Sequence, residues 1–426
     1  MDIRITKPIQ GGTIKAIASK SDAHRLLICA ALADSDTYIA CPTRSEDINA
    51  TANCLEALGA VVRYELDGFY VTPISGSKAG EDRLLDCGES GSTLRFLLPV
   101  CGALGARVSL EMGGRLPTRP LSPLYDEMIA NGCKLSEHGV SPLHCEGRLR
   151  SGTYTIPGHI SSQYISGLLF ALPLLSGESI IRVTGVLESR PYVDMTLDSL
   201  RRFGIIVFEE DEQAELIFRI PGSQIFRSPK TISVEGDWSN AAFWLCAGAI
   251  LSNGSKITCT GLNPDSKQGD RAVIEILRRF GAEICIENDS VTVSPGRLSG
   301  LEINAENTPD LVPVLAAVAS VANGTTTIYN AGRLRIKESD RLFSVTDTLT
   351  QLGANVTETP DGLVIIGKNS LPGGITKSYG DHRIAMTAAI LSTMCSGDVV
   401  IQNAEAVNKS YPNFFSDFSM LGGGIL

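Results

Sequence analysis

Six stretches of the chain are apolar at nearly every position, and each opens on a serine, a proline or an aspartate. They begin at Ser21, Ser92, Ser162, Ser239, Pro309 and Asp381. These residue types are favoured at the N-terminus of a helix, and apolar residues on all faces are typical of a helix that is buried. The pattern therefore predicts six buried helices.

A second series of helical segments interleaves with the first, and each of its members runs into a glycine. These glycines are Gly59, Gly132, Gly204, Gly281, Gly353 and Gly422. Glycine suits the left-handed conformation that ends a helix, and the β-branched residues that usually follow favour a strand. Short strands are also predicted after the six buried helices, at 37–40, 107–111, 180–184, 256–260, 325–329 and 399–402.

Both series recur at intervals of roughly 70 residues, so the chain consists of six copies of one helix-strand-helix-strands unit. The widest interval separates the third copy from the fourth and predicts a domain boundary near Asp237. The sixth copy lacks its last strands, which the two short strands expected within residues 1–19 could supply. We therefore expect one domain over 20–237 and a second domain over 1–19 plus 238–426.

Composition and charge narrow the class of protein. Hydrophobic residues make up 43% and charged residues 20%, as in an ordinary globular protein. A net charge of -10 argues against nucleic acid or an anionic membrane as a partner. Eleven cysteines without a CxxC pair indicate free thiols in a reducing compartment, and the N-terminal sequence lacks the apolar region of a signal peptide. We expect a cytoplasmic protein without a membrane span.

Cations, hydroxyls and amides gather at the predicted helix starts and in the charged loops. Examples are Lys20, Arg25, Gly91, Arg119, Ser161, Gln163, Ser189, Lys337, Arg383 and Lys409. Taken singly, each has a structural explanation, because serine is a common helix cap and 337–341 could form a solvated ion pair. Their recurrence at equivalent points of the repeat, in an acidic chain, favours a site for a strongly anionic small molecule between the two domains.

Two carboxylates stand beside these cations. Asp310 opens the fifth buried helix, and Glu338 is flanked by Lys337 and Arg341. Fixed cations keep a carboxylate ionised whereas a bound phosphate opposes ionisation, so such a site can carry out acid/base chemistry. The five histidines form no HxxxH motif and no Cys/His cluster, so no metal is expected, and nucleotide-binding glycine loops are absent from the sequence.

Six motifs, in order along essentially the whole chain, resemble those of the 5-enolpyruvylshikimate-3-phosphate synthase family. They are SKSDAHR (19–25), GESGSTLR (88–95), SSQ (161–163), SRPY (189–192), RIKESDR (335–341) and DHRIAM (381–386). The resemblance implies an α/β protein, a two-domain inside-out α/β barrel of six βαβαββ repeats with three in each domain. It also implies transfer of the enolpyruvyl group of phosphoenolpyruvate to the 5-hydroxyl of shikimate 3-phosphate, through a tetrahedral intermediate and with release of phosphate.

The resemblance further implies roles for individual residues, without a metal or an organic cofactor. Shikimate 3-phosphate would contact Lys20, Ser21, Arg25, Ser161, Ser162, Gln163, Ser189, Tyr192, Asp310 and Lys337. Phosphoenolpyruvate would contact Lys20, Gly91, Arg119, Gln163, Arg341, Arg383 and Lys409. Asp310 would accept the 5-hydroxyl proton, and Glu338, with Lys20 as a second candidate, would deliver a proton to the methylene carbon. Beyond these small molecules no partner is implied, and we expect a monomer in the shikimate pathway to chorismate and the aromatic amino acids.

Two positions depart from the family's pattern, and two alternative functions stay open. Glu89 stands where many members have Asn, and Arg333 where some have Asn, so sensitivity to glyphosate, which competes for the phosphoenolpyruvate site in this family, can differ. The related transferase that acts on UDP-N-acetylglucosamine would require Asn in place of Ser21 and a Cys within 115–120. A non-catalytic anion-binding protein on the same fold would be expected to lack Asp310 and Glu338.

Overall fold

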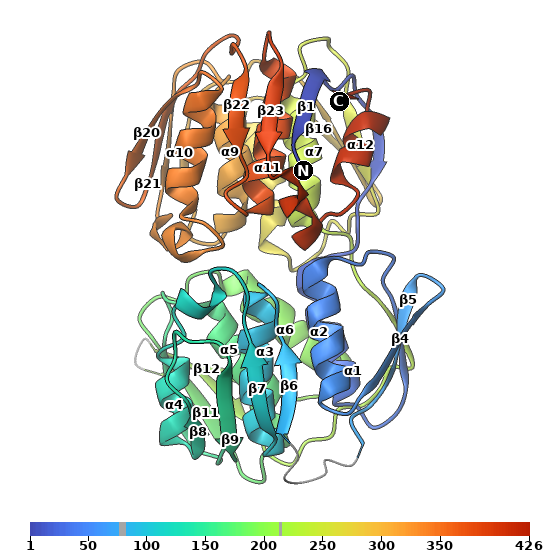
Figure 1. Ribbon diagram of the computed structural model, residues 1–426, viewed down its shortest axis with the longest axis vertical. Coiled ribbons are helices and arrows are strands. Elements are labelled where there is room, and N and C mark those ends of the chain that lie inside the picture. The colour runs from blue at the N-terminus through green and yellow to red at the C-terminus, as the bar shows by residue number, and fades with distance from the viewer. Residues whose placement is uncertain (76–81, 213–214) are drawn as a thin grey trace. The chain divides into compact units, whose positions relative to one another are not determined.

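The computed structural model describes residues 1–75, 82–212 and 215–426 (Figure 1). The chain divides into two compact units: a contiguous unit, Lys20–Val234, and a split unit, Met1–Ser19 with Glu235–Leu426. The contiguous unit ends slightly before Asp237, because the chain that follows it pairs with the segment that precedes it. The Ser19 N–H donates to the Glu235 carbonyl, and the Asp237 N–H donates to the Ile17 carbonyl, each at 2.8 Å.

The described strands form six four-stranded sheets, and all six share one topology. In one of them, β10 (Thr153–Pro157) runs parallel to β11 (Ser179–Thr184), which is antiparallel to β13 (Glu215–Ile220), which is antiparallel to β12 (Phe208–Glu212). A parallel pair joined through a helix, followed by a hairpin, is what one βαβαββ repeat produces. The α/β class and the sixfold repeat are therefore confirmed, whereas the described strands form separate sheets and not a closed barrel.

The other five sheets follow the same order, and the strands predicted after the buried helices are the second strand of each. The contiguous unit contains two of these sheets. The first has the strand order β14 (Thr231–Ser233), β3 (Thr37–Ala40), β5 (Gly68–Thr72), β4 (Val61–Glu65), and the second has the order β6 (Asp82–Asp86), β7 (Arg107–Glu111), β9 (Leu143–Gly147), β8 (Cys133–Leu135). In the split unit they are β2 (Gly12–Lys15), β15 (Ile257–Thr260), β17 (Ser290–Ser294), β16 (Glu283–Glu287), then β18 (Glu302–Asn304), β19 (Thr325–Tyr329), β21 (Gly362–Ile366), β20 (Asn355–Thr359), and β22 (Gly374–Lys377), β23 (Val399–Gln402), β1 (Ile3–Lys7), β24 (Gly424–Ile425).

The two N-terminal strands join different sheets of the split unit. β1 completes the sheet of the sixth copy, where Ile3 pairs with Ile401 and Ile5 with Ile425. β2 instead lies parallel to β15 in the sheet of the fourth copy. Of the two strands expected to complete the sixth copy, only β1 does so. The strand in front of the buried helix of the fourth copy, β14, pairs with β3 in the first copy, and β2 takes the corresponding place beside β15.

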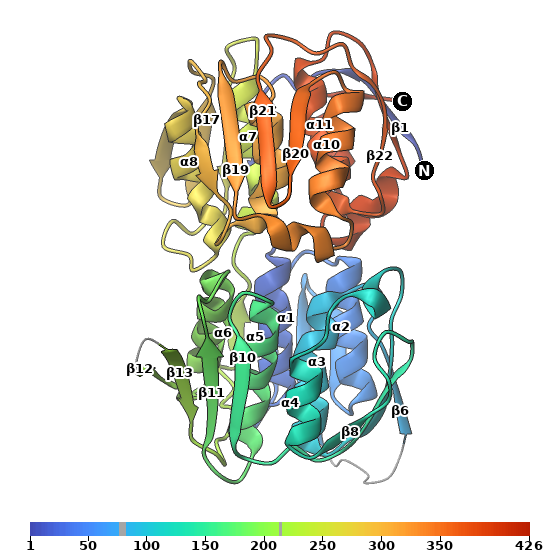
Figure 2. The same ribbon diagram turned by 90° about the vertical axis from the view of Figure 1, so that its left-hand side faces the viewer.

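Six apolar helices run inside the sheets, three in each unit, as Figures 1 and 2 show. They are α1 (Lys20–Ala31), α3 (Gly91–Leu104), α5 (Ser162–Ala171), α7 (Trp238–Ile250), α9 (Val312–Ala319, after a 3₁₀ turn at Pro309–Leu311) and α11 (His382–Leu391). Every residue of α11 is buried, which confirms the predicted burial of this helix. At Gly167 in α5, an added Cβ would lie 2.2 Å from the Arg95 carbonyl oxygen of α3, so glycine permits the close approach of these two helices.

The second helical series also lies where the sequence predicts it. Its members are α2 (Glu46–Ala57), α4 (Leu124–Ala130), α6 (Arg190–Arg202), α8 (Val273–Phe280), α10 (Arg341–Gln351) and α12 (Phe414–Met420). The glycine after each has a positive φ, for example 108° at Gly281, whose N–H donates to the carbonyls of Leu277 and Arg278. Within the described ranges, no helix has the length and apolar character needed to cross a membrane.

Candidate active site

One group of predicted residues in the contiguous unit meets at the N-termini of α3 and α5. The Gln163 side chain donates to Ser92 Oγ at 3.0 Å and accepts from Arg95 Nη1 at 2.8 Å. A Cβ added at Gly91 would lie 2.8 Å from Arg95 Nη1 and 3.0 Å from Arg119 Nη1, so both guanidinium groups lie against this helix start. Backbone N–H groups, the helix dipole and two cations converge here, an arrangement that suits a phosphate or a carboxylate.

Serine side chains cap both of these helices. Ser161 Oγ accepts from the Gln163 N–H at 3.3 Å, and Ser90 Oγ accepts from the Thr93 N–H at 3.2 Å. Ser162, the first residue of α5, is buried. A capping hydroxyl keeps its own hydrogen as a donor, so Ser161 can cap its helix and still donate to a bound anion.

Arg25 connects α1 to α6, where the predicted Ser189 and Tyr192 lie. Its side chain is buried, with Nη2 donating to the Tyr192 carbonyl at 2.7 Å and Nε to Thr196 Oγ1 at 2.9 Å. Burial lowers the pKa of Arg25 to about 10, against the opposing effect of Asp22, so the guanidinium remains charged at neutral pH. Ser189 precedes α6 in the left-handed conformation, with φ 55°.

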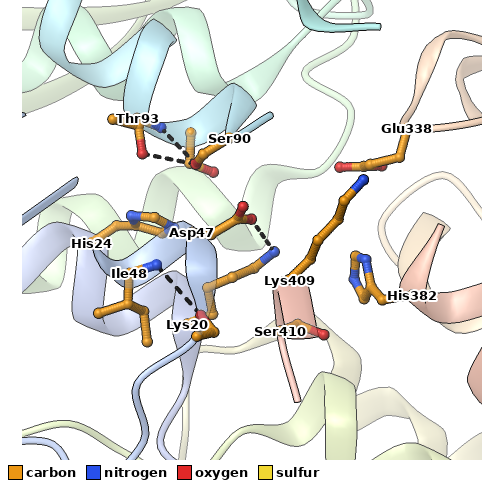
Figure 3. Close-up of polar contacts among 12 residues, drawn as sticks. Lys20, His24, Asp47, Ile48, Ser90, Thr93, Glu338, His382, Lys409 and Ser410 are labelled. Atoms are coloured by element: carbon orange, nitrogen blue, oxygen red, sulfur yellow. Dashed lines mark hydrogen bonds and ion pairs between the residues drawn. The ribbon is translucent and has the colours of Figure 1, made fainter. Parts of the chain in front are cut away.

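Lys20 has an acidic partner that is not among the residues predicted from the sequence. Its Nζ lies 2.7 Å from Asp47 Oδ2, in the first turn of α2 (Figure 3). A second connection joins these two helices to α3, since His24 Nδ1 lies 2.6 Å from Thr51 Oγ1, which lies 2.7 Å from Thr93 Oγ1. Burial lowers the pKa of His24, with smaller contributions from Lys20 and from Arg25, so this contact involves a neutral imidazole. The starts of α1, α2 and α3 are thereby held together.

In the split unit, the predicted residues gather around one arginine. Arg341, at the start of α10, is only 1% exposed. Its Nε donates to Asp381 Oδ2, its Nη1 to Asp310 Oδ1 and its Nη2 to Glu338 Oε2, each at 2.7 Å. Burial alone would lower the pKa of Arg341, but the three carboxylates outweigh it and raise the pKa above the ordinary arginine value. Both predicted acid/base residues are therefore bound to one cation.

Asp310 is shared with a second predicted arginine. Arg383 Nη2 donates to Asp310 Oδ2, and Arg383 Nη1 to the Asp310 carbonyl, both at 3.0 Å. Burial raises the pKa of Asp310, but Arg383, Lys337 and Arg341 together outweigh burial and hold the pKa below the ordinary aspartate value. Asp310 is thus ionised, and its basicity would rise if the arginines turned towards a bound anion.

The remaining predicted residues of the split unit surround this group. Burial lowers the pKa of Lys337 to about 8, against the opposing effect of Asp310. Lys409 Nζ donates to the Gly380 carbonyl at 2.7 Å, and Figure 3 shows the Lys409 side chain pointing towards the Glu338 carboxylate. In the part of the chain that the structure describes, no group of three or more His, Cys, Asp or Glu residues could hold a metal ion.

Two acidic residues of these networks, Asp47 and Asp270, were not predicted from the sequence. Asp270, discussed below, lies in a 3₁₀ turn, Gly269–Ala272, immediately before α8. Both therefore occupy the loop or first turn of a Gly-ended helix, as Arg119, Ser189 and Lys337 do. The repeat is the signal that could have found them, because the loop or first turn of the Gly-ended helix carries an acid in the first and fourth copies and a predicted cation or hydroxyl in the second, third and fifth.

Comparisons with known proteins agree with this geometry. Residues 3–418 match the model of the family described as EPSP synthase (3-phosphoshikimate 1-carboxyvinyltransferase). The chain is 45% identical over 417 residues to the 3-phosphoshikimate 1-carboxyvinyltransferase of Clostridium kluyveri, covering 97% of this chain and 96% of that one, and 43% identical to the enzyme of the same name from Clostridium acetobutylicum, over the same shares of the two chains.

Solved structures give the same result. An EPSP synthase from Acinetobacter baumannii superposes with a TM-score of 0.82 at 26% identity, covering 100% of this chain and 99% of that one. The enolpyruvyl transferase NikO from Streptomyces tendae shares the fold, with a TM-score of 0.79 at 18% identity, covering 100% of this chain and 98% of that one. The resemblance carried by the six motifs is thus confirmed, and the chain belongs to the EPSP synthase family of enolpyruvyl transferases.

Proposed function

We propose that the chain transfers the enolpyruvyl group of phosphoenolpyruvate to the 5-hydroxyl of shikimate 3-phosphate and releases phosphate. The observation that carries this proposal is the Arg341 guanidinium, which holds Asp310 and Glu338 on separate nitrogens. An addition followed by an elimination needs one group that accepts a proton from an alcohol and one that gives a proton to carbon. Two carboxylates, fixed apart by a common cation, can fill these two roles.

Shikimate 3-phosphate would bind chiefly to residues of the contiguous unit. They are Lys20, Ser21, Arg25, Ser161, Ser162, Gln163, Ser189 and Tyr192, with Asp310 and Lys337 contributed by the split unit. Support comes from the hydroxyls at the start of α5 and from Arg25, which is charged although it is buried. A phosphate dianion gains charge-assisted hydrogen bonds from such groups without new reorganisation of the protein.

Phosphoenolpyruvate would bind to a set that is richer in arginine. The set is Lys20, Gly91, Arg119, Gln163, Arg341, Arg383 and Lys409. Planar guanidinium groups match the two oxygens of a carboxylate or phosphate, and Gly91 leaves room for Arg119 against the α3 N-terminus.

The proton transfers follow from the charge network. When Arg341 and Arg383 turn towards phosphoenolpyruvate, Asp310 loses part of its compensation and becomes able to take the 5-hydroxyl proton. The hydroxyl oxygen then bonds to C2 of phosphoenolpyruvate while Glu338, which the anionic substrates help to protonate, gives a proton to C3. In the second step the Glu338 carboxylate takes a proton back from C3, the double bond between C2 and C3 forms again, the bond from C2 to the phosphate oxygen breaks, and phosphate leaves with both electrons.

We further propose that the chain works as a monomer in the cytoplasm without a metal or an organic cofactor. The support is its acidic composition, its free cysteines and the sufficiency of its own acids and bases for both steps.

Phosphate release tests the proposal. Purified protein would be given phosphoenolpyruvate with shikimate 3-phosphate, and in parallel phosphoenolpyruvate with UDP-N-acetylglucosamine. We expect release only with shikimate 3-phosphate. Phosphate release only with UDP-N-acetylglucosamine would show that this compound is the acceptor in place of shikimate 3-phosphate. If folded protein released no phosphate with either acceptor, the non-catalytic alternative would be favoured.

A further inference from the structure

Asp270 is a buried acidic residue to which the proposed mechanism gives no part. It is 3% exposed, and its Oδ1 has no hydrogen-bond partner among the described residues. Burying a carboxyl group with an unsatisfied oxygen is costly, so such a group in a folded protein calls for an explanation. Its neighbours include Arg383 and Asp310, two of the proposed active-site residues of the split unit.

Ser239, in the first turn of α7, connects Asp270 to Arg383. Arg383 Nη2 donates to Ser239 Oγ at 2.7 Å and to Asp310 Oδ2 at 3.0 Å. Because the Ser239 oxygen already accepts from Arg383, its hydroxyl hydrogen is available to the Asp270 carboxyl, whose pKa the Ser239 side chain lowers. One guanidinium nitrogen thus contacts the proposed base directly and a second carboxyl through a hydroxyl.

Asp270 and Asp310 also interact through their charges. Burial raises the pKa of Asp270 and the negative charge of Asp310 raises it further, while Arg383 and the Ser239 hydrogen bond lower it and Asp237, the N-cap of α7, raises it. The two aspartates therefore compete for the positive charge of Arg383. A change in the contact of Arg383 with one aspartate therefore also changes the pKa of the other.

We propose that Asp270 is a positioning residue that acts through Ser239 to hold the Arg383 guanidinium beside Asp310, in the place from which it can turn to bind phosphoenolpyruvate. The inference rests on the proposed function, since it takes Arg383 as a phosphoenolpyruvate ligand. Asp270 touches neither substrate in this scheme. Loss of the Asp270 carboxylate should therefore weaken the binding of phosphoenolpyruvate, through Arg383, and leave the residues of α5 that bind shikimate 3-phosphate in place.

The test is a double-mutant cycle on Asp270→Asn and Ser239→Ala, with steady-state kinetics for both substrates. We expect each single variant to raise the KM for phosphoenolpyruvate roughly tenfold, with a smaller change in kcat and with the KM for shikimate 3-phosphate nearly unchanged, as expected for loss of a charge-assisted contact. The double variant should be no worse than either single variant, because both changes break the same connection. Ser239→Thr, which keeps the hydroxyl, should restore the wild-type KM.

Controls separate positioning from folding and from the proposed function. Asp265→Asn, an exposed change in the same loop, should leave both KM values unchanged. An unchanged KM for phosphoenolpyruvate in Ser239→Ala, or additive effects in the double variant, would overturn the inference, and Ser239→Ala decides it even if Asp270→Asn fails to fold. Wild-type protein without phosphate release would instead overturn the proposed function, so the two failures are distinct.

Discussion

Buried arginines are surrounded by different kinds of oxygen in the two units. In the contiguous unit Arg25 donates to a carbonyl and a hydroxyl, and Arg95 donates to the Gln163 amide oxygen and the Pro120 carbonyl. In the split unit Arg341 donates to three carboxylates. Lys20, paired with Asp47, is the exception in the contiguous unit.

This difference separates binding from proton transfer. A cation that donates to neutral oxygens keeps more of its positive charge available than one that donates to carboxylates, so it attracts a phosphate more strongly. A cation among carboxylates forms a nearly balanced cluster in which a small change of charge alters the affinity of each carboxylate for a proton. The contiguous unit is therefore suited to hold an anion, and the split unit to move protons.

The contrast between the two units would be contradicted most directly if a carboxylate of the split unit could be removed without loss of turnover. We expect Glu338→Gln to lower kcat by about 100- to 10,000-fold, because an amide has no acidic proton to give to carbon. Calorimetry should show shikimate 3-phosphate affinity retained. The exposed Glu302→Gln, on β18, is the matched control, and near-normal turnover of Glu338→Gln would remove this residue from the proton-transfer role.

Stability should distinguish the two kinds of buried arginine. Lysine has one nitrogen and cannot take the positions of the three guanidinium nitrogens that contact the carboxylates, so we expect Arg341→Lys to cost about 3–5 kcal/mol in the free energy of unfolding, the range for breaking a buried ion pair. Arg25→Lys loses hydrogen bonds to neutral oxygens and should cost about 1–2 kcal/mol. Urea unfolding of both variants measures the difference, and equal losses would contradict the contrast drawn between the units.

A pair of helix caps tests whether the contiguous unit binds the first anion. Ser161→Ala and Ser45→Ala each remove the N-cap of a helix, α5 and α2 respectively, and each should cost about 1 kcal/mol of stability. Only Ser161→Ala should also lower the affinity for shikimate 3-phosphate, by roughly tenfold, because it removes a hydrogen-bond donor to the phosphate. If calorimetry gave the same affinity for both variants, Ser161 would be a cap and nothing more.

The smallest effect concerns Lys337, whose pKa is lowered to about 8. Above that pH its ammonium group loses its proton, so we expect shikimate 3-phosphate affinity to fall by at most tenfold per pH unit, a fall that Lys337→Arg should abolish. The stability contribution of Lys337 has the opposite sign. Between about pH 8 and the ordinary lysine range the unfolded chain binds more protons than the folded one, so this contribution rises with pH. A pH-independent affinity would exclude Lys337 as a charged ligand.

The repeat made most of the fold predictable from the sequence. Gly-ended helices and apolar helices recur in register, so their positions, and the strands after them, follow from local patterns. The path of 1–19 did not follow, because both strands are short and amphipathic and nothing local distinguishes the sheet of β23 from that of β15. Strand partners so distant in sequence are fixed by the assembled unit alone.

The sequence indicated which cations and hydroxyls gather at the helix starts, but not which side chains pair with one another. Cations at helix starts could be read from the sequence because the repeat places them at equivalent points. Which carboxylate pairs with which cation depends on side-chain directions that no sequence pattern encodes, as the shared contacts of Arg341 illustrate. The link between Asp270 and Arg383 is harder still to predict, since it runs through the hydroxyl of a third residue, Ser239.

The pairing of β1 with β23 and β24 has a consequence for the order of events on the ribosome. Ile3 is translated before the contiguous unit and its partner Ile401 long after it, so β1 stays without its neighbours while the whole contiguous unit is made. The contiguous unit has all of its strands as soon as Val234 has left the exit tunnel. Because domains fold as units during synthesis, the contiguous unit, proposed to hold the first anion, would fold first, and the split unit would complete its sheet only when β23 and β24 have been released.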